Sequence, residues 1–290
     1  MKRIFILSFL VLAILSFSSC EEEINLQLDS SAPRLVVNGM ISTDTTMHWV
    51  TLTQSGDYFN HQPARPISGA FVEISDADSS FLLTESTERP GHYHTPSSYY
   101  GKSGIEYRLT IKNVNIEGIS ADEIFEASST LPNYVECDSA VVDFSDQYQW
   151  WKIIIYAQDP PNETNYYLFS LLNNGKNVTD AYDRMVILDD RYFDGNYADG
   201  VWIFGLDPDD GDNLEPGDIL TIETYSIDEA YYDYIYGVQT EMAGNNPLFS
   251  GSPANVPGNI SNGALGCFAA CSVSRLSFTN HYSLEEMKNR

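Results

Sequence analysis

The stretch SGIEYRLTIKN, residues 103–113, alternates apolar and polar side chains one by one. Its apolar set is Ile105, Tyr107, Leu109 and Ile111, and its polar set is Glu106, Arg108, Thr110 and Lys112. Because successive side chains of a strand point to opposite faces, this period of two predicts a β-strand with one buried face.

The segments before this stretch carry similar strand and turn signals. RLVVNGMIS (34–42), HWVTLTQS (48–55) and the strand within RPGHYHTP (89–96) are separated by loops, and residues 70–75 and 80–86 predict a hairpin around a turn at 76–79. Short strands at this spacing are typical of antiparallel sandwiches. We therefore predict an antiparallel β-sandwich over residues 34–131. The pattern GA-x-V, then G-x-Y, then G-x-x-Y-x-L-x-I resembles small immunoglobulin-like or transthyretin-like modules, which implies that type of sandwich.

The sequence changes character after Pro132. WWKIIIYAQD (150–159), TNYYLFSLLNNG (164–175) and DILTIETYSI (218–227) predict strands, whereas residues 176–217 are rich in Asp, Gly and Asn and predict loops. A helix is expected near 229–242, with Asp228 as its N-cap. Its predicted apolar face is Tyr231, Tyr234, Ile235, Val238 and Met242. The fold class is thus mainly all-β, with a larger β-rich domain with one helix over 132–290.

The chain starts with a pattern typical of secretion. Lys2 and Arg3 precede an uncharged apolar run at 4–17 and the small pair Ser18-Ser19. The run is too short for an ordinary transmembrane helix, which needs about 20 residues. With Cys20 next, the pattern resembles a bacterial lipobox, although Phe17 stands where Leu is usual. The resemblance implies that residues 1–19 are a lipoprotein signal peptide and that Cys20 is lipidated, which anchors the chain to a membrane.

Three carboxylates follow the cysteine at once. Glu21, Glu22 and Glu23 resemble the export signal of Bacteroidota lipoproteins, which implies an outer-membrane anchor on the extracellular face. The alternative is that residues 20–33 form only an acidic tether, which self-repulsion keeps extended.

The strongly acidic charge balance excludes some classes of binding partner. Forty-one acidic residues against 15 basic ones give a net charge of −26. Such a surface repels phosphate backbones, so no nucleic-acid partner is expected, and it disfavours anionic lipid headgroups. The acidity suits solubility, bound cations or a basic partner patch.

Two segments are candidates for binding a cation. LDPDDGDNLEPGD (206–218) gathers Asp207, Asp209, Asp210 and Asp212 around Gly211, and Ca²⁺ favours several hard oxygens on a flexible loop. The alternative is a solvated turn that uses Asp and Gly for backbone reasons. His92 and His94 share one strand face and are able to bind a metal, unless Tyr93 enters the core and the histidines face solvent. Beyond possible calcium, no cofactor is expected.

Cysteines and tyrosines give further expectations. Cys267 and Cys271 are four residues apart, more than about 13 Å on a strand, so we expect free, mostly buried thiols, as for Cys137. Tyr232 and Tyr236 lie off the apolar helix face and, with Phe249, are candidates for a partner or ligand surface. The alternative for the two tyrosines is packing under the neighbouring loop.

The second half also resembles a known family. Gly217-Asp218, the Tyr-rich segment 231–236, the loop 246–253 and the segment 259–268 are similar to motifs of a Bacteroidota outer-membrane lipoprotein family, known as domain of unknown function 4249. The resemblance covers nearly the whole mature chain.

This resemblance implies a function but no chemistry. It implies an accessory to a TonB-dependent outer-membrane β-barrel transporter, or to another outer-membrane assembly, that captures ligand or docks a partner. No catalytic residues carry over. The sequence also has no G-x-S-x-G, H-E-x-x-H or P-loop motif, so we expect no enzyme. A structural surface protein or adhesin is the alternative, and an enzyme comes third.

Overall fold

The alternating stretch at 103–113 forms β8 (Glu106–Lys112), whose burial alternates as its sequence does. The protein is described by a computed structural model that covers residues 32–56, 63–244 and 254–289. Strand β8 lies inside a four-stranded antiparallel sheet of order β5-β4-β8-β9, which we call sheet B. The remaining strands of this sheet are β4 (Phe71–Ser75), β5 (Ser80–Leu82) and β9 (Phe125–Thr130).

A ten-stranded sheet runs through most of the described chain. Its main path is β13-β12-β16-β17-β1-β2-β7-β6, with β14 beside β12 and β3 beside β2. Its strands are β1 (Leu35–Ser42), β2 (Trp49–Gln54), β3 (Arg65–Pro66), β6 (Thr84–Glu85), β7 (His92–His94), β12 (Tyr166–Asn173), β13 (Lys176–Asn177), β14 (Val186–Asp189), β16 (Ile219–Ile227) and β17 (Leu265–Thr279).

The third sheet, sheet C, has the order β10-β11-β15 and is antiparallel. Its strands are β10 (Cys137–Ser145), β11 (Trp150–Gln158) and β15 (Tyr197–Leu206). Two short 3-10 helices, η1 (Tyr182–Arg184) and η2 (Pro208–Asp210), lie in the connections between strands. Strands β13, β14 and β15 fall in the 176–217 segment that was predicted to be loop-rich, so that prediction was wrong for these residues.

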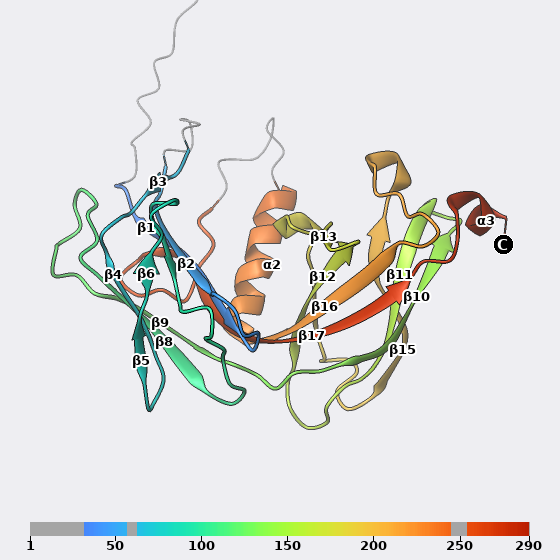
Figure 1. The fold of residues 1–290 in the computed structure, drawn as a ribbon, viewed down its shortest axis with the longest axis horizontal. Coiled ribbons are helices and arrows are strands. Elements are labelled where there is room, and N and C mark those ends of the chain that lie inside the picture. The colour runs from blue at the N-terminus through green and yellow to red at the C-terminus, as the bar shows by residue number, and fades with distance from the viewer. Residues whose placement is uncertain (1–31, 57–62, 245–253, 290) are drawn as a thin grey trace, which may run out of the picture. The chain divides into compact units, whose positions relative to one another are not determined.

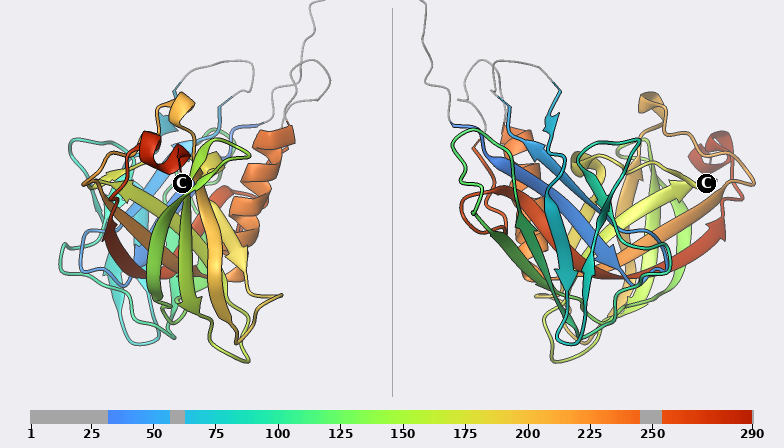
Figure 2. Two further views of the ribbon diagram at one scale, coloured as in Figure 1. Left: turned by 90° about the vertical axis from the view of Figure 1, so that its right-hand side faces the viewer. Right: turned by 60° about the vertical axis from the view of Figure 1, so that its left-hand side comes forward.

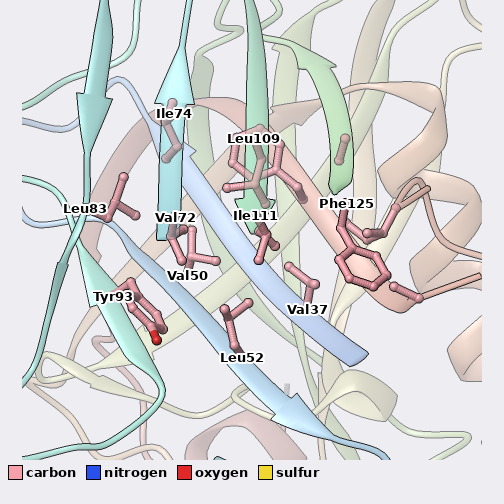
Figure 3. Close-up of a cluster of buried hydrophobic side chains, with 14 of the residues drawn as sticks. Val37, Val50, Leu52, Val72, Ile74, Leu83, Tyr93, Leu109, Ile111 and Phe125 are labelled. Atoms are coloured by element: carbon pink, nitrogen blue, oxygen red, sulfur yellow. The ribbon is translucent and has the colours of Figure 1, made fainter. Parts of the chain in front are cut away.

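Two apolar cores lie between the ten-stranded sheet and the two smaller sheets, and a third apolar cluster lies on its opposite face. The first lies between its β1-β2-β7 part and sheet B, where Val37, Leu52 and Tyr93 meet Leu109 and Phe125 (Figure 3). The second lies between β12-β16 and sheet C. Trp151 is the one indole among its buried side chains, and Phe169 and Leu171 lie in the same core. Each core is thus a sandwich, which confirms the all-β fold class.

Strand β17 takes part in both sandwiches (Figures 1 and 2). It pairs with β1 in parallel through Cys271 and with β16 in antiparallel fashion from Ser272 onward. Even-numbered side chains such as Phe268 reach the first core, and Phe278 packs against the second. The domain boundary predicted after residue 131 stays a prediction.

The opposite face of the ten-stranded sheet is covered by α2 (Glu229–Gly244). Asp228 caps the helix, because its Oδ1 accepts a hydrogen bond of 2.9 Å from the Tyr231 N–H. Ile235 is fully buried against Leu168, Ile227 and Cys271. The predicted apolar face extends one turn too far, since Met242 is 46% exposed.

A second, short helix, α3 (Leu284–Lys288), closes the second core with Met287. None of the helices in the described part of the chain combines the length and apolar character needed to cross a membrane.

Gly266 is the tightest point of β17. Its φ is +89°, and a Cβ added there would lie 1.8 Å from the Val37 carbonyl oxygen. At this positive φ an added Cβ would point at the paired strand β1, so the position requires glycine.

We predict that Gly266→Ala lowers the free energy of unfolding by about 3 kcal/mol, because it combines positive-φ strain with a backbone clash. Gly263→Ala is the matched control: its φ is +70°, but the added Cβ would meet only the Arg34 side chain, at 3.8 Å. It should cost about 1 kcal/mol. Urea unfolding curves measure both changes, and equal losses would contradict the clash at Gly266.

Candidate functional site

The predicted calcium loop lies on η2 and the turn after it. The Asp207 side chain accepts a hydrogen bond from the Asp209 N–H at 2.9 Å, and Asp212 is ion-paired with Arg184. Gly211 ends the 3-10 turn at a φ of +91°. Two of the four carboxylates thus have local partners, and no three of the four lie close enough together to share an ion. Calcium binding at this loop stays a prediction.

A different carboxylate cluster is present in the described residues. Asp159 follows β11, and Asp190 and Asp194 belong to the turn after β14; their ligand oxygens all lie within 4.8 Å of one another. Asp159 and Asp190 are buried, whereas Asp194 is exposed. Sequence analysis missed this group because the three residues are 31 and 4 positions apart. Only the fold brings them together.

Backbone and hydroxyl donors hold the cluster. Asp159 accepts hydrogen bonds from the Tyr167 hydroxyl at 2.6 Å and from the Gly195 N–H at 2.9 Å. The Asn165 N–H donates to Asp190 at 2.7 Å. These donors stabilise the buried carboxylates without a basic side chain.

The electrostatics of the cluster follow from burial. Loss of water raises the pKa of Asp159, and the neighbouring Asp190 and Asp194 raise it further. Burial, followed by the hydrogen bond to Asp159, also raises the pKa of Tyr167. Three oxygen ligands are of the type that a hard divalent cation takes. The hydrogen bonds within the cluster already satisfy much of its acceptor capacity.

The histidine pair flanks an indole ring. Trp49 of β2 lies 6.4 Å from the His92 ring and 5.0 Å from the His94 ring, measured between centroids, and the Arg89 guanidinium stacks over it at 4.4 Å. Tyr93 points into the first core and donates to the Ile67 carbonyl at 2.9 Å. The interpretation of Tyr93 as a core residue is confirmed.

The cysteines outside the chain start are free, as predicted. Cys267 and Cys271 are buried on β17, and burial raises the pKa of Cys267 to about 12. Such thiols are poor nucleophiles at neutral pH. Cys137 is half-buried, and its pKa is also raised by burial.

Of the predicted partner surface, two tyrosines lie in the described residues. The Tyr232 and Tyr236 rings stack with centroids 6.5 Å apart and an interplanar angle of 5°. Tyr232 is half-buried, and its hydroxyl donates a hydrogen bond to an Asp189 carboxylate oxygen at 3.1 Å. Tyr236 is 59% exposed. Phe249 lies outside the described residues. A role of Tyr236 in binding stays a prediction.

A larger exposed aromatic group lies on sheet C. Tyr148, in the turn before β11, has its ring centroid 5.7 Å from that of Trp150 and 5.9 Å from that of Trp202 on β15. We call these three residues the aromatic platform. Tyr148 is 51% exposed and Trp202 is 40% exposed.

Local backbone geometry fixes the platform. The β11–β15 register shifts between Ile153 and Ile154, which is a β-bulge that leaves both Ile203 and Phe204 buried and turns Trp202 to the outer face. The Trp202 indole N–H donates to the Phe204 carbonyl at 2.6 Å. The bulge and this hydrogen bond fix the orientation of the Trp202 ring in the absence of a partner.

A glycine and an ion pair complete the surface. Gly205 lies beside both indoles: an added Cβ would come 2.9 Å from Trp150 and 3.4 Å from Trp202. The Lys152 Nζ lies 5.9 Å from the centre of the Trp202 ring and 2.6 Å from an Asp143 carboxylate oxygen. The sequence signal for this surface was the adjacent pair Trp150-Trp151. Neighbouring side chains of a strand lie on opposite faces, and Trp151 is the buried one.

These features define an all-β protein with two cores on one shared sheet and an exposed aromatic surface on the second sandwich. The chain belongs to the family described as "Domain of unknown function (DUF4249)", whose model matches residues 21–277. No curated protein matches the chain.

The raised pKa of Asp159 predicts a pH dependence of stability. A carboxyl group whose pKa is higher in the folded state holds its proton longer there, so folding is favoured at low pH and the free energy of unfolding falls as pH rises through the raised pKa. Asp159→Asn should flatten this decline, beginning near the unfolded-state pKa of about 3.9. Urea unfolding at a series of pH values measures it.

The wild-type chain, measured at the same pH values, is the reference for this comparison. A decline of equal steepness in the wild-type and Asp159→Asn chains would show that the buried carboxyl does not cause it.

Proposed function

We propose that the protein is a non-catalytic surface lipoprotein, anchored to the outer membrane through Cys20, that serves as an accessory docking subunit of a TonB-dependent transporter or another outer-membrane assembly. The pattern around Cys20 supports the anchor, and Glu21–Glu23 support the outward address. These residues lie outside the described residues, so their support is from sequence alone.

The aromatic platform is the observation that carries the docking role. Aromatic side chains dominate binding energy at protein interfaces, since each buries a large area at a low cost in conformational entropy. Tyr148 and Trp202 leave about half of their surfaces in water, at 51% and 40% exposure. A partner that covers these rings would gain their burial without having to order them first.

The surroundings of the platform suit a protein partner. Lys152 and Asp143 form a partly exposed ion pair at its edge, and charged pairs at the rim of an interface contribute to orientation more than to affinity. The chain as a whole is strongly acidic, with a net charge of −26. A partner patch with basic residues around an apolar centre would complement both features.

We expect the full-length lipoprotein, purified from detergent-solubilised outer membrane, to bring down a β-barrel protein in stoichiometric amount. The double variant Tyr148→Ala/Trp202→Ala should recover about tenfold less of it, because two rings at the centre of an interface contribute at least about 1.4 kcal/mol together.

Tyr192→Ala is the matched control, since Tyr192 is 89% exposed and outside the platform. It should recover as much partner as the wild type. Absence of any stoichiometric β-barrel partner would reject the accessory role and favour the structural or adhesive alternative. Equal recovery by the double variant would place the interface elsewhere.

A further inference from the structure

A pocket with a volume of ≈ 220 Å³ opens on the first sandwich, where the β4–β5 turn of sheet B meets the loop after β7. Its walls also include residues of β5 and β8, and we call it the tyrosine pocket. A cavity of about 150 Å³ is enough to hold a benzene ring. The tyrosine pocket therefore has room for one six-membered ring with its substituents.

Aromatic rings form the apolar wall of the tyrosine pocket. Tyr99 and Tyr107 are buried, with 8% and 2% of their surfaces exposed, and the Phe81 ring packs edge-on against Tyr99 with centroids 5.0 Å apart. Tyr100 also lines the pocket and is 50% exposed. The face of an aromatic ring is electron-rich, so it attracts the polarised C–H groups of a saturated ring that carries oxygen.

The two buried phenol hydroxyls have hydrogen-bonding capacity to spare. The Tyr107 hydroxyl accepts a hydrogen bond of 2.8 Å from the Lys102 N–H, but it donates to none of the described residues. The Tyr99 hydroxyl makes no hydrogen bond within the described part of the chain. Buried tyrosine hydroxyls usually find a partner, and leaving a donor unpaired is unfavourable. These two donors point to a ligand with acceptor oxygens.

The tyrosine pocket also offers an acceptor. One carboxylate oxygen of Asp76 accepts hydrogen bonds from the Asp78 and Ser79 N–H groups, at 2.9 and 2.7 Å, and from the Ser79 hydroxyl. Its second oxygen accepts none from the described residues. Burial raises the pKa of Tyr99, and the nearby Tyr107 and Asp76 raise it further. The carboxylate thus lies near the hydroxyl that has no partner.

The charges of the tyrosine pocket favour a neutral ligand. Lys102 is the one basic residue among those that line it, and Asp76 is the one acidic residue. A cation would be repelled by the first and an anion by the second. A neutral ligand must accept hydrogen bonds from the phenols and donate one to Asp76. A proline-rich segment offers acceptors alone, whereas a hydroxyl group both donates and accepts.

Backbone contacts hold the wall at 96–102 in place. The Gly101 N–H donates to the Ser42 carbonyl at 2.7 Å, and the Thr46 N–H donates to the Tyr99 carbonyl at 3.1 Å. A Cβ added to Gly101 would lie 2.5 Å from the Leu131 side chain, so this loop packs closely on the sandwich. A ligand that enters a pocket with fixed walls pays little for ordering them.

We propose that the tyrosine pocket binds one pyranose unit of a neutral carbohydrate, whose C–H face lies on the tyrosine rings and whose hydroxyls bond to Tyr99, Tyr107 and Asp76. A pyranose combines an apolar ring face with hydroxyls that both donate and accept. The pocket belongs to the first sandwich, whereas docking was assigned to the aromatic platform on the second. The inference therefore goes beyond the proposed docking function.

The test uses the full chain with Cys20→Ser, which removes the predicted lipidation and the need for detergent. The probes are the methyl α- and β-pyranosides of glucose, galactose, mannose and N-acetylglucosamine, followed by saturation-transfer difference NMR. We expect saturable binding of at least one of them. Methoxycyclohexane has the same ring size and methoxy group but no hydroxyl, and it should not bind. Absence of saturable binding by every pyranoside, or equal binding of methoxycyclohexane, would overturn the proposal.

Two conservative variants locate the site. Tyr99→Phe removes only the hydroxyl, and Asp76→Asn keeps an oxygen for the turn but replaces the second oxygen by a donor. Each should weaken binding of the pyranoside by about tenfold, the effect of one hydrogen bond. Tyr192→Phe is the matched control, because Tyr192 is 89% exposed and outside the pocket. If either variant binds as tightly as Tyr192→Phe does, the assigned contacts are wrong and the proposal is overturned.

Stability of the unliganded chain gives a second readout. The Tyr99 hydroxyl has no partner among the described residues, so Tyr99→Phe should leave the midpoint of urea unfolding unchanged or raise it. A lower midpoint would show that the hydroxyl serves the fold and would overturn its assignment to a ligand. Neither experiment bears on recovery of a β-barrel partner, so the two proposals fail separately.

Discussion

The structure depends on the double pairing of β17. This one strand of 15 residues is hydrogen-bonded to β1 through Cys271 and to β16 from Ser272 onward. Its even-numbered side chains pack against both cores, while Cys271 on the other face packs under α2. The two pairings follow each other on a single strand with no loop between them, so the two sandwiches share one continuous segment of hydrogen-bonded backbone. The small residues of GCFAAC at 266–271 follow from burial on both faces.

Sheet C is where this scaffold presents the proposed docking surface. Side chains alternate along β11, so Trp150 faces outward to the aromatic platform while Trp151 is fully buried. Across the same strands, the small residues Cys137, Ala157 and Ala198 line a gap of only ≈ 50 Å³ on the inner side. The bulges between β11 and β15 serve the outer face, because they keep Ile203 and Phe204 buried and still expose Trp202. The proposed docking surface thus lies on the outer face of a three-stranded sheet whose inner face packs on the second core.

Local patterns predicted the elements but not their partners. Alternation identified β8, and the capping Asp228 located the start of α2, because both signals depend on neighbouring residues alone. Strand β15 was missed because Asp199, Gly200 and Gly205 are typical of loops. Gly200 lies at a β-bulge, and Gly205 leaves room for the rings of Trp150 and Trp202. The carboxylate cluster and the aromatic platform were also missed, since each joins residues that only pairing of distant strands brings together. Where the protein works stays a prediction, which rests on the sequence signals at Cys20 and Glu21–Glu23.

The central claim is that β17 makes the two sandwiches one cooperative unit. Native-state hydrogen exchange of the full chain, over a series of guanidinium concentrations, tests it most directly. The most protected amides of β8, in the first sandwich, and of β11, in the second, should exchange with the same free energy and the same denaturant dependence, because both open only in global unfolding. Free energies that differ by more than about 2 kcal/mol, with separate denaturant dependences, would show that the sandwiches unfold independently and would contradict the account.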